Sequence, residues 1–143
     1  MRESLGLFNL LITSNGALTI ILLILILAWC GWLAFSHYRV HKIAAFISQK
    51  ALIQGKRKAQ IIDVRERKAF NAGHILGARN IPYSTFRAFY KGIRRDMPVF
   101  LYDQGTTLSS RAAWFLYKKG YRKLYILKEG YRNWNGKTKK RDV

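Results

Sequence analysis

The spacing of hydrophobic and polar residues divides the chain into two parts. Residues 17–35 are apolar apart from Thr19 and Gly31, and no Asp, Glu, Lys or Arg occurs between Ser4 and Ser36. A helix of about 20 apolar residues spans the hydrocarbon core of a bilayer. The pattern therefore predicts one transmembrane helix over residues 17–36, preceded by a short segment of residues 1–16.

A cleaved signal peptide is the competing interpretation of this apolar run. Ala34-Phe35-Ser36 has the small-x-small pattern of a cleavage site. Against it, the run is longer than the roughly 7–15 apolar residues of a signal sequence. Arg2 is also balanced by Glu3 where a signal sequence carries net positive charge. These features favour a membrane anchor that is retained.

Charged residues on the two sides of the predicted helix set its orientation. Arg2 and Glu3 cancel before the helix, whereas six basic residues follow it within residues 39–58. Positively charged flanks stay in the cytoplasm, so residues 1–16 are expected outside and the C-terminal part inside. Trp29, Trp32 and Tyr38 suit the aromatic belt of a membrane interface. The predicted location is the cell membrane, crossed once.

Short apolar runs recur in the rest of the chain. AQIIDV, PVFLY and RKLYIL predict buried strands at residues 59–64, 98–102 and 122–127, and ARNIPY predicts an extended piece at 78–83. The intervening segments have helical spacing or helix-stop signals, and Ser84 is a plausible N-cap in the third. These segments are FISQKALIQGKRK, RKAFNAGHI, YSTFRAFYKGIRR, SSRAAWFLYKKG and KEGYRNWNG.

Strands that alternate with helices indicate an α/β fold, in which a parallel sheet is covered by helices on both faces. We expect this domain over residues 46–135. Residues 37–45 would form a juxtamembrane linker or helical extension, and the basic tail of residues 136–143 is expected to be disordered.

The formal net charge is +19, from 26 Lys and Arg against 7 Asp and Glu. All of these residues except Arg2 and Glu3 follow the predicted membrane helix. A basic domain below a membrane is attracted to anionic lipid, at about 1 kcal/mol for each basic residue close to the surface. Nucleic acid is an equally suitable partner for such a surface, and net charge alone specifies none.

The single cysteine, Cys30, lies within the predicted membrane helix. The predicted domain therefore has no thiol for a disulfide, for a cysteine-based zinc site or for nucleophilic catalysis. His37 and His41 are spaced to share one helix face, but two ligands without a third make a weak metal site. We expect neither a metal nor a cofactor.

Two segments resemble one protein family. IIDVRERKAFNAGHILGARNIP (residues 61–82) resembles the rhodanese pattern of a strand ending in Asp-Val-Arg, followed by Phe and then Gly-His-Ile-x-Gly-Ala-x-Asn-Ile-Pro. LKEGYRNW (residues 127–134) resembles the closing Leu-x-Gly-Gly-x-x-x-Trp element, with Glu129 in place of its first glycine. The resemblance implies a rhodanese-like parallel sheet flanked by helices. It also implies a structural role for Asp63, Arg65, Gly73 and His74.

The same resemblance places YDQGTTLSSRAAWFL at the rhodanese active-site loop. Asp103 then occupies the position of the catalytic cysteine, and Leu108 stands where the loop arginine is common. The active-site-like loop comprises Asp103, Gln104, Gly105, Thr106, Thr107, Leu108 and Ser109. Sulfur transfer needs a thiolate that carries the sulfur as a persulfide, and a carboxylate cannot form one. We therefore predict no catalytic residue in this loop.

Two interpretations of Asp103 remain open. It is either a built-in anion that fills the former thiolate pocket and locks the loop, or a turn or cap residue that faces water. Phosphoryl transfer through Asp103 is disfavoured, because no second aspartate or carboxylate cluster is present to hold magnesium.

The sequence favours a single-pass membrane protein whose inactive rhodanese-like domain is a binding or scaffold module in the cytoplasm. Its expected partners are the anionic leaflet and a membrane-associated protein. One alternative is a sulfurtransferase-related protein that works with a partner's cysteine. The other is a basic module that binds RNA, the ribosome or anionic lipid.

Overall fold

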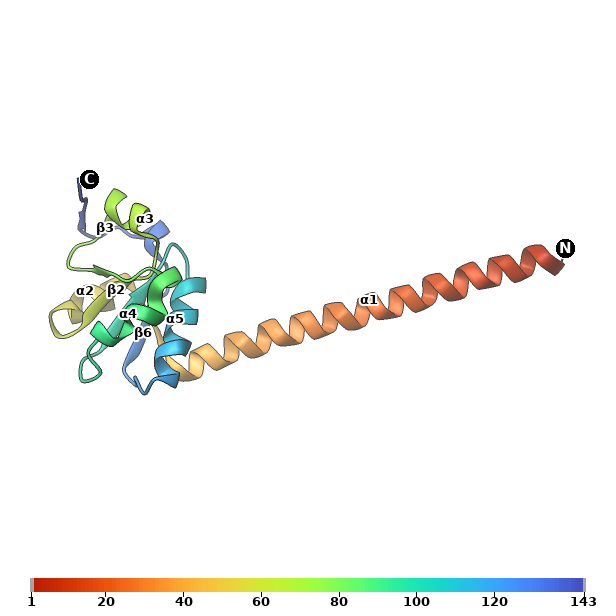
Figure 1. The fold of residues 1–143 in the computed structure, drawn as a ribbon, viewed down its shortest axis with the longest axis horizontal. Helices are drawn as coiled ribbons and strands as arrows, with labels where there is room; N and C mark the ends of the chain where they lie inside the picture. The colour runs from red at the N-terminus through yellow and green to blue at the C-terminus, as the bar shows by residue number, and fades with distance from the viewer. Residues whose placement is uncertain (1, 143) are drawn as a thin grey trace. The chain divides into compact units, whose positions relative to one another are not determined.

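The computed structural model describes residues 2–142 and divides into two units, Met1–Tyr38 and Arg39–Val143. Helix α1 (Arg2–Ile43) is continuous (Figure 1). Its segment Asn15–Ile43 has a mean hydropathy of 2.6 and is long and apolar enough to cross a membrane. By length and composition alone, this N-terminal helix fits either a membrane anchor or a signal sequence.

The second unit contains a five-stranded sheet in the order β1-β6-β5-β2-β4, with every pairing parallel. Its strands are β1 (Ala45–Ile47), β2 (Gln60–Asp63), β4 (Arg79–Asn80), β5 (Val99–Tyr102) and β6 (Leu124–Leu127). Asp63 of β2 lies opposite Tyr102 of β5, so both strands end at the same edge of the sheet. The loops that follow the two strands, beginning at Val64 and Asp103, therefore both leave the sheet at this edge.

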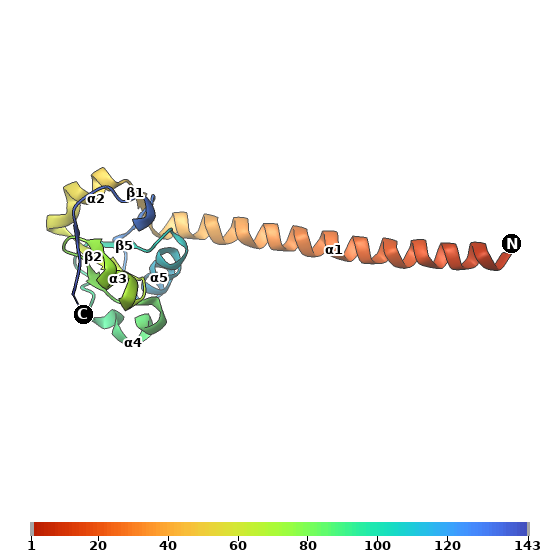
Figure 2. The same cartoon turned by 90° about the horizontal axis from the view of Figure 1, so that it is seen from above.

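Helices cover both faces of this sheet. They are α2 (Gln49–Gly55), α3 (Arg67–Ala72), α4 (Phe86–Phe89) and α5 (Thr107–Lys118). Figure 2 shows α2 on one side of the sheet and α4 and α5 on the other. The side chains of β5 alternate between the two resulting cores, with Leu101 in the core under α5 and Phe100 in the core under α2. The predicted α/β fold with a parallel sheet flanked by helices is confirmed.

The prediction of a helix in FISQKALIQGKRK is correct in its end at Gly55 but wrong at its start. Phe46 and Ile47 belong to the edge strand β1, which pairs with β6, and α2 begins only after Ser48. The Ser48 hydroxyl accepts a hydrogen bond of 3.2 Å from the Ala51 N–H and caps the helix. A strand of three residues is too short to show the alternation that would reveal it.

The predicted helix in YSTFRAFYKGIRR is broken into three single turns: η2 (Tyr83–Thr85), α4, and η3 (Tyr90–Gly92). Ser84 does not cap it, and its hydroxyl lies 3.1 Å from a Glu66 carboxylate oxygen instead. The breaks bring Phe86 and Ile93 into the core but leave Phe89 63% exposed. The Tyr121 hydroxyl donates to the Ile93 carbonyl at 2.7 Å, which holds this segment against the domain.

Within residues 136–142 the tail forms a strand, contrary to the expectation of disorder. Strand β7 (Thr138–Lys139) pairs antiparallel with β3 (His74–Ile75) outside the main sheet. The Leu76 N–H donates to the Lys137 carbonyl at 3.1 Å, and the Arg141 N–H donates to the Asn71 carbonyl at 3.0 Å. These bonds use main-chain groups, so the polar side chains of the tail carry no hydrophobic pattern that would have indicated a strand.

Candidate functional site

The Asp103 carboxylate lies at the start of helix α5. Asp103 directly follows β5 and is 4% exposed. One carboxylate oxygen accepts a hydrogen bond of 3.1 Å from the Leu108 N–H, and the other accepts one of 2.7 Å from the Ser109 hydroxyl. The N-cap residue of α5, Thr106, makes no side-chain capping bond. Asp103 therefore supplies the acceptor and the negative charge that a helix N-terminus favours.

The loop between β5 and α5 is held from the opposite side by the segment after β6. The Tyr131 N–H donates to the Asp103 carbonyl at 2.8 Å, and the Arg132 N–H donates to the Gln104 carbonyl at 3.2 Å. Gly130 has φ +67°, and a Cβ there would lie 2.5 Å from the main-chain carbonyl oxygen of Gln104. This position therefore requires glycine both for its backbone conformation and for its close approach to the loop.

The loop residues differ in exposure. Gln104 and Thr107 are exposed, Gly105, Thr106 and Leu108 are half-buried, and Asp103 and Ser109 are buried. Asp103 thus does not face water, and its side chain is directed to α5 rather than to solvent. The arrangement gives the loop a buried anion that belongs to the protein itself.

Asp63 and Arg65 form a buried ion pair beside this loop. Asp63 is fully buried, and the Arg65 guanidinium contacts its carboxylate at 2.6 Å. The same guanidinium nitrogen donates to the Gly73 carbonyl at 2.8 Å, and the Arg65 N–H donates to Asp63 at 2.8 Å. Burial lowers the pKa of Arg65, but the hydrogen bond and charge of Asp63 outweigh it and leave this pKa above its ordinary value.

Two stacked tyrosines connect the ion pair to the loop. The Arg65 guanidinium lies 4.0 Å from the centre of the Tyr131 ring, and this ring stacks on Tyr102 with 6.1 Å between centroids. Tyr102 precedes Asp103 in the chain, and Tyr131 donates its N–H to the Asp103 carbonyl. A Cβ on Gly73 would lie 2.8 Å from the Tyr131 hydroxyl oxygen, so a side chain there would displace this hydroxyl. The buried pair therefore supports the base of the loop through Tyr131.

The phenol of Tyr102 is itself buried and hydrogen bonded. It accepts a bond of 3.1 Å from the Ile75 N–H. Burial raises the pKa of Tyr102 well above its ordinary value, and the negative charge of Asp63 adds to this effect. Tyr102 thus stays neutral in the folded protein at physiological pH.

His74 takes no part in this network. Its ring is 3% exposed and stacks on Phe70 with 3.7 Å between centroids. Its Nδ1 lies 2.8 Å from the Phe70 carbonyl oxygen, which fixes the ring between α3 and β3. This position suits a histidine that joins two elements rather than a base that meets a substrate.

The structure therefore brings Asp63, Arg65 and Gly73 together next to the Asp103 loop, while His74 lies against Phe70. Tyr102 and Tyr131 connect the two parts and were not identified from the sequence. Tyr131 lies within the closing element LKEGYRNW, which was the available signal. Within residues 2–142 no group of three or more His, Cys, Asp or Glu side chains is placed to hold a metal ion. The expectation of no metal stays a prediction.

Comparison with known proteins identifies the class to which this domain belongs. The family model for the rhodanese-like domain matches residues 48–137, which is more than half of the chain. The chain belongs to the rhodanese-like domain family.

Individual relatives support this assignment. The chain is 43% identical over 119 residues to the uncharacterized protein YqhL of Bacillus subtilis, covering 83% of this chain and 94% of YqhL. It is 32% identical over 76 residues to the thiosulfate sulfurtransferase GlpE of Pseudomonas putida, covering 53% of this chain and 69% of GlpE. The named relatives are bacterial, and one of them is described as an enzyme.

Solved structures show the same fold. The rhodanese-related protein of Thermoplasma volcanium is similar with a TM-score of 0.62 and 23% identity, over 66% of this chain and 97% of that protein. A rhodanese-like domain protein of Staphylococcus aureus is similar with a TM-score of 0.61 and 18% identity, over 68% of this chain and 99% of that protein. At these identities the likeness concerns the fold alone.

Proposed function

We propose that this chain is a membrane-anchored rhodanese-like protein without sulfurtransferase activity of its own, which presents its domain to the cytoplasm as a binding or scaffold module. The observation that carries this proposal is the state of Asp103. The family resemblance places Asp103 at the position of the catalytic cysteine. There its carboxylate is buried and accepts hydrogen bonds from the Leu108 N–H and the Ser109 hydroxyl.

The chemistry of a carboxylate supports an inactive loop. Rhodanese catalysis stores a sulfur atom on a thiolate, and an aspartate oxygen cannot take that role. The only thiol of the chain, Cys30, belongs to the apolar helix. The Asp103 charge also repels an external anion such as thiosulfate from the start of α5. The loop therefore lacks both the nucleophile and the vacant anion site that the reaction requires.

The apolar helix supports the anchored arrangement. Its length fits one bilayer crossing, and basic residues follow it while Arg2 and Glu3 cancel before it. The proposed location is a bacterial cell membrane, with residues 1–16 outside and the domain in the cytoplasm.

A group of basic and aromatic side chains on α5, in the turn that follows it and at the end of α1 supports a partner at the membrane. The Arg39 guanidinium lies 3.8 Å from the centre of a Trp114 ring, and the Lys118 ammonium lies 5.1 Å from the same residue. Arg122 lies 4.4 Å from the centre of the Tyr117 ring. Amphipathic rings with cations suit the interface of an anionic leaflet or an acidic membrane-associated protein. RNA or the ribosome remains an alternative partner for the same surface.

A sulfurtransferase-related function that uses a partner's cysteine is the second candidate. Its support is the similarity to the thiosulfate sulfurtransferase GlpE. In this version the domain would bind a protein that carries the sulfur, and the partner would supply the thiol.

The test is a sulfur-transfer assay with the full chain in uncharged detergent. The chain is incubated with thiosulfate and cyanide, and thiocyanate is measured against a protein-free blank, with Pseudomonas putida GlpE as the positive control. We expect no thiocyanate above the blank. Turnover by the chain alone would overturn the proposal. Turnover only after addition of a thiol-containing membrane extract would favour the second candidate.

A further inference from the structure

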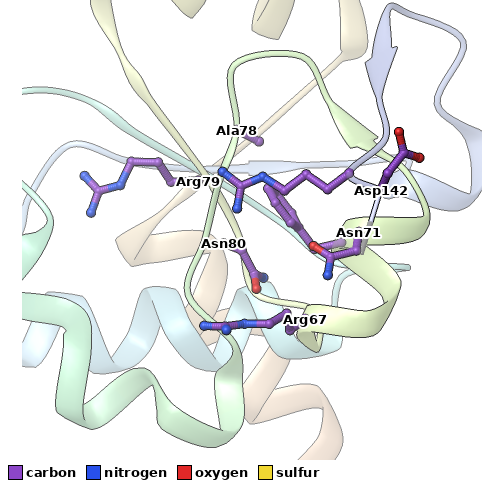
Figure 3. A pocket seen from close by; sticks show the side chains of 8 residues that line it. Arg67, Asn71, Ala78, Arg79, Asn80 and Asp142 are labelled. Carbon is purple, nitrogen blue, oxygen red and sulfur yellow. The ribbon is translucent and has the colours of Figure 1, made fainter.

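A pocket of about 390 Å³ lies beside the edge strand β4 (Figure 3). Its polar lining consists of Arg67, Asn71, Arg79, Asn80, Arg141 and Asp142. No residue between Asp103 and Ser109 belongs to the lining. Its volume lies within the roughly 300–1,000 Å³ of small-molecule sites.

Three separate segments of the chain build this pocket. Arg67 begins α3, Arg79 lies on β4, and Arg141 follows β7. The pairing of β7 with β3 brings the tail here, and the hydrogen bond from the Arg141 N–H to the Asn71 carbonyl fixes it at α3. The tail therefore adds Arg141 to the two arginines that α3 and β4 contribute to the pocket.

The charge of the pocket is unbalanced. The salt bridges found within residues 2–142 join Arg65 to Asp63 and Arg94 to Asp96, so no lining arginine has an ion-pair partner there. Asp142 is the acidic residue of the lining, and Figure 3 shows its carboxylate directed away from Arg67 and Asn80. Arg67, Arg79 and Arg141 are exposed to solvent, and three positive charges against one negative charge in the lining favour an anion over a cation.

The lining also offers contacts to an uncharged part of a ligand. Asn80 uses its side-chain N–H groups for the Asp63 and Arg65 carbonyls, which leaves its side-chain oxygen available as an acceptor. Asn71 and Ala78 are half-buried, and the buried Phe70 borders the pocket beneath the Arg141 guanidinium, which lies 5.7 Å from the centre of its ring. Guanidinium groups bind phosphate in a bidentate manner, and amide oxygens accept from hydroxyls.

From this combination we propose that the pocket binds a phosphate monoester of a small hydroxylated molecule. The phosphate is held by Arg67 and Arg141, and Asn71 and Asn80 contact the hydroxyl-bearing part. Arg79 donates to the Gly92 carbonyl at 3.2 Å and adds positive charge at the rim. The same phosphate chemistry occurs in free metabolites and in the headgroup of phosphatidic acid, so the two sources need separate experiments.

The test uses the full chain in nanodiscs, with binding followed by calorimetry. One arm adds glycerol 3-phosphate to discs of neutral lipid. A second arm measures binding of the nanodisc-held chain to separate vesicles with and without phosphatidic acid. Arg67→Gln and Arg141→Gln are compared with Arg111→Gln, which removes the same charge from an exposed residue outside the pocket. Thermal unfolding of each variant checks that the domain remains folded.

We expect glycerol 3-phosphate to bind, and each pocket variant to weaken binding about tenfold, the factor expected for one lost charged hydrogen bond. Arg111→Gln should leave the affinity for glycerol 3-phosphate unchanged. Binding only to vesicles with phosphatidic acid, with the same loss in the pocket variants, would assign the site to a lipid headgroup. No binding in either arm would overturn the proposal. So would an equal loss in all three variants, because that indicates general electrostatic attraction.

Discussion

The Ser109 hydroxyl donates a hydrogen bond of 2.7 Å to the Asp103 carboxylate, and this bond joins the end of β5 to the first turn of α5. The other carboxylate oxygen accepts from the Leu108 N–H. Asp103 and Ser109 are buried, so the bond between them forms away from competing water, whereas the bond from Leu108 is partly buried. The Asp103 carboxylate thus serves as an internal capping group for helix α5.

Removal of this carboxylate should destabilise the domain. In Asp103→Ala the Leu108 N–H loses its acceptor and the Ser109 hydroxyl keeps only the Thr106 carbonyl, 3.1 Å away. The expected cost is about 2–4 kcal/mol for two charged hydrogen bonds that other acceptors partly replace. Asp103→Asn keeps the shape and one acceptor oxygen, so a smaller loss is expected. Urea unfolding of the full chain in detergent measures both. Asp142→Ala, which removes an exposed carboxylate, is the matched control. An unchanged free energy of unfolding for Asp103→Ala would show that the carboxylate does not lock the loop.

Two arginine–aspartate pairs of the domain differ in burial and should differ in their contribution to the free energy of unfolding. Arg65→Gln leaves the fully buried Asp63 carboxylate without its cation, and breaking a buried pair costs about 3–5 kcal/mol. Arg94→Gln breaks the exposed pair with Asp96, and we expect no measurable change. Chemical denaturation of the two variants side by side measures the difference. Equal effects would contradict a supporting role of Arg65 beneath the loop.

Gly130 should tolerate alanine less well than Gly77 does. Both glycines have positive φ, +67° and +90°, so alanine at either position is strained by about 1–2 kcal/mol. A Cβ added at Gly77 would meet nothing within 4 Å, whereas a Cβ added at Gly130 would lie 2.5 Å from the main-chain carbonyl oxygen of Gln104. Gly130→Ala must therefore also displace the Asp103 loop. The difference between the two unfolding free energies isolates this contact, and equal values would mean that the loop moves aside freely.

The buried phenol of Tyr102 predicts a loss of stability at alkaline pH. Its pKa is raised in the folded protein, so the unfolded chain ionises first, above about pH 10. The stabilising effect is fully present below that pH and decreases as the pH rises toward the folded-state pKa. Denaturation curves between about pH 8 and about pH 11 should show this decline. Tyr102→Phe removes the titrating group and should make the decline of stability with pH less steep. Tyr38→Phe, which changes an exposed tyrosine, should leave the decline as it is. An identical decline in all three proteins would contradict the assignment to Tyr102.

The sequence predicted the strands that are formed by continuous runs of buried apolar side chains. The apolar runs of β2, β5 and β6 are buried on both faces of a parallel sheet, and their hydrophobicity is continuous enough to detect. Strand β1 escaped prediction because it has three residues, and β7 because it has two residues whose side chains are exposed. Its main-chain bonds to β3 hold this part of the tail without any apolar side chain.

The site was predictable in its residues but not in its geometry. Family motifs indicated Asp63, Arg65 and Gly73, yet no spacing rule reveals that Arg65 lies over Tyr131. Likewise, the choice between a buried and a water-facing Asp103 depends on how the loop packs against Gly130, which is a contact between distant segments. The arginine pocket was missed because Arg67, Arg79 and Arg141 meet only after the tail pairs with β3.

The most direct test of an inactive loop is whether this domain can hold a sulfur atom. The full chain is incubated with thiosulfate, and the peptides of residues 39–143 are examined by mass spectrometry for an added sulfur. Asp103→Cys in a Cys30→Ala background is the comparison, since it restores a thiol at residue 103 alone. We predict no adduct on the unsubstituted domain and a cyanide-removable sulfur on Asp103→Cys. A sulfur adduct on the unsubstituted domain would contradict the account.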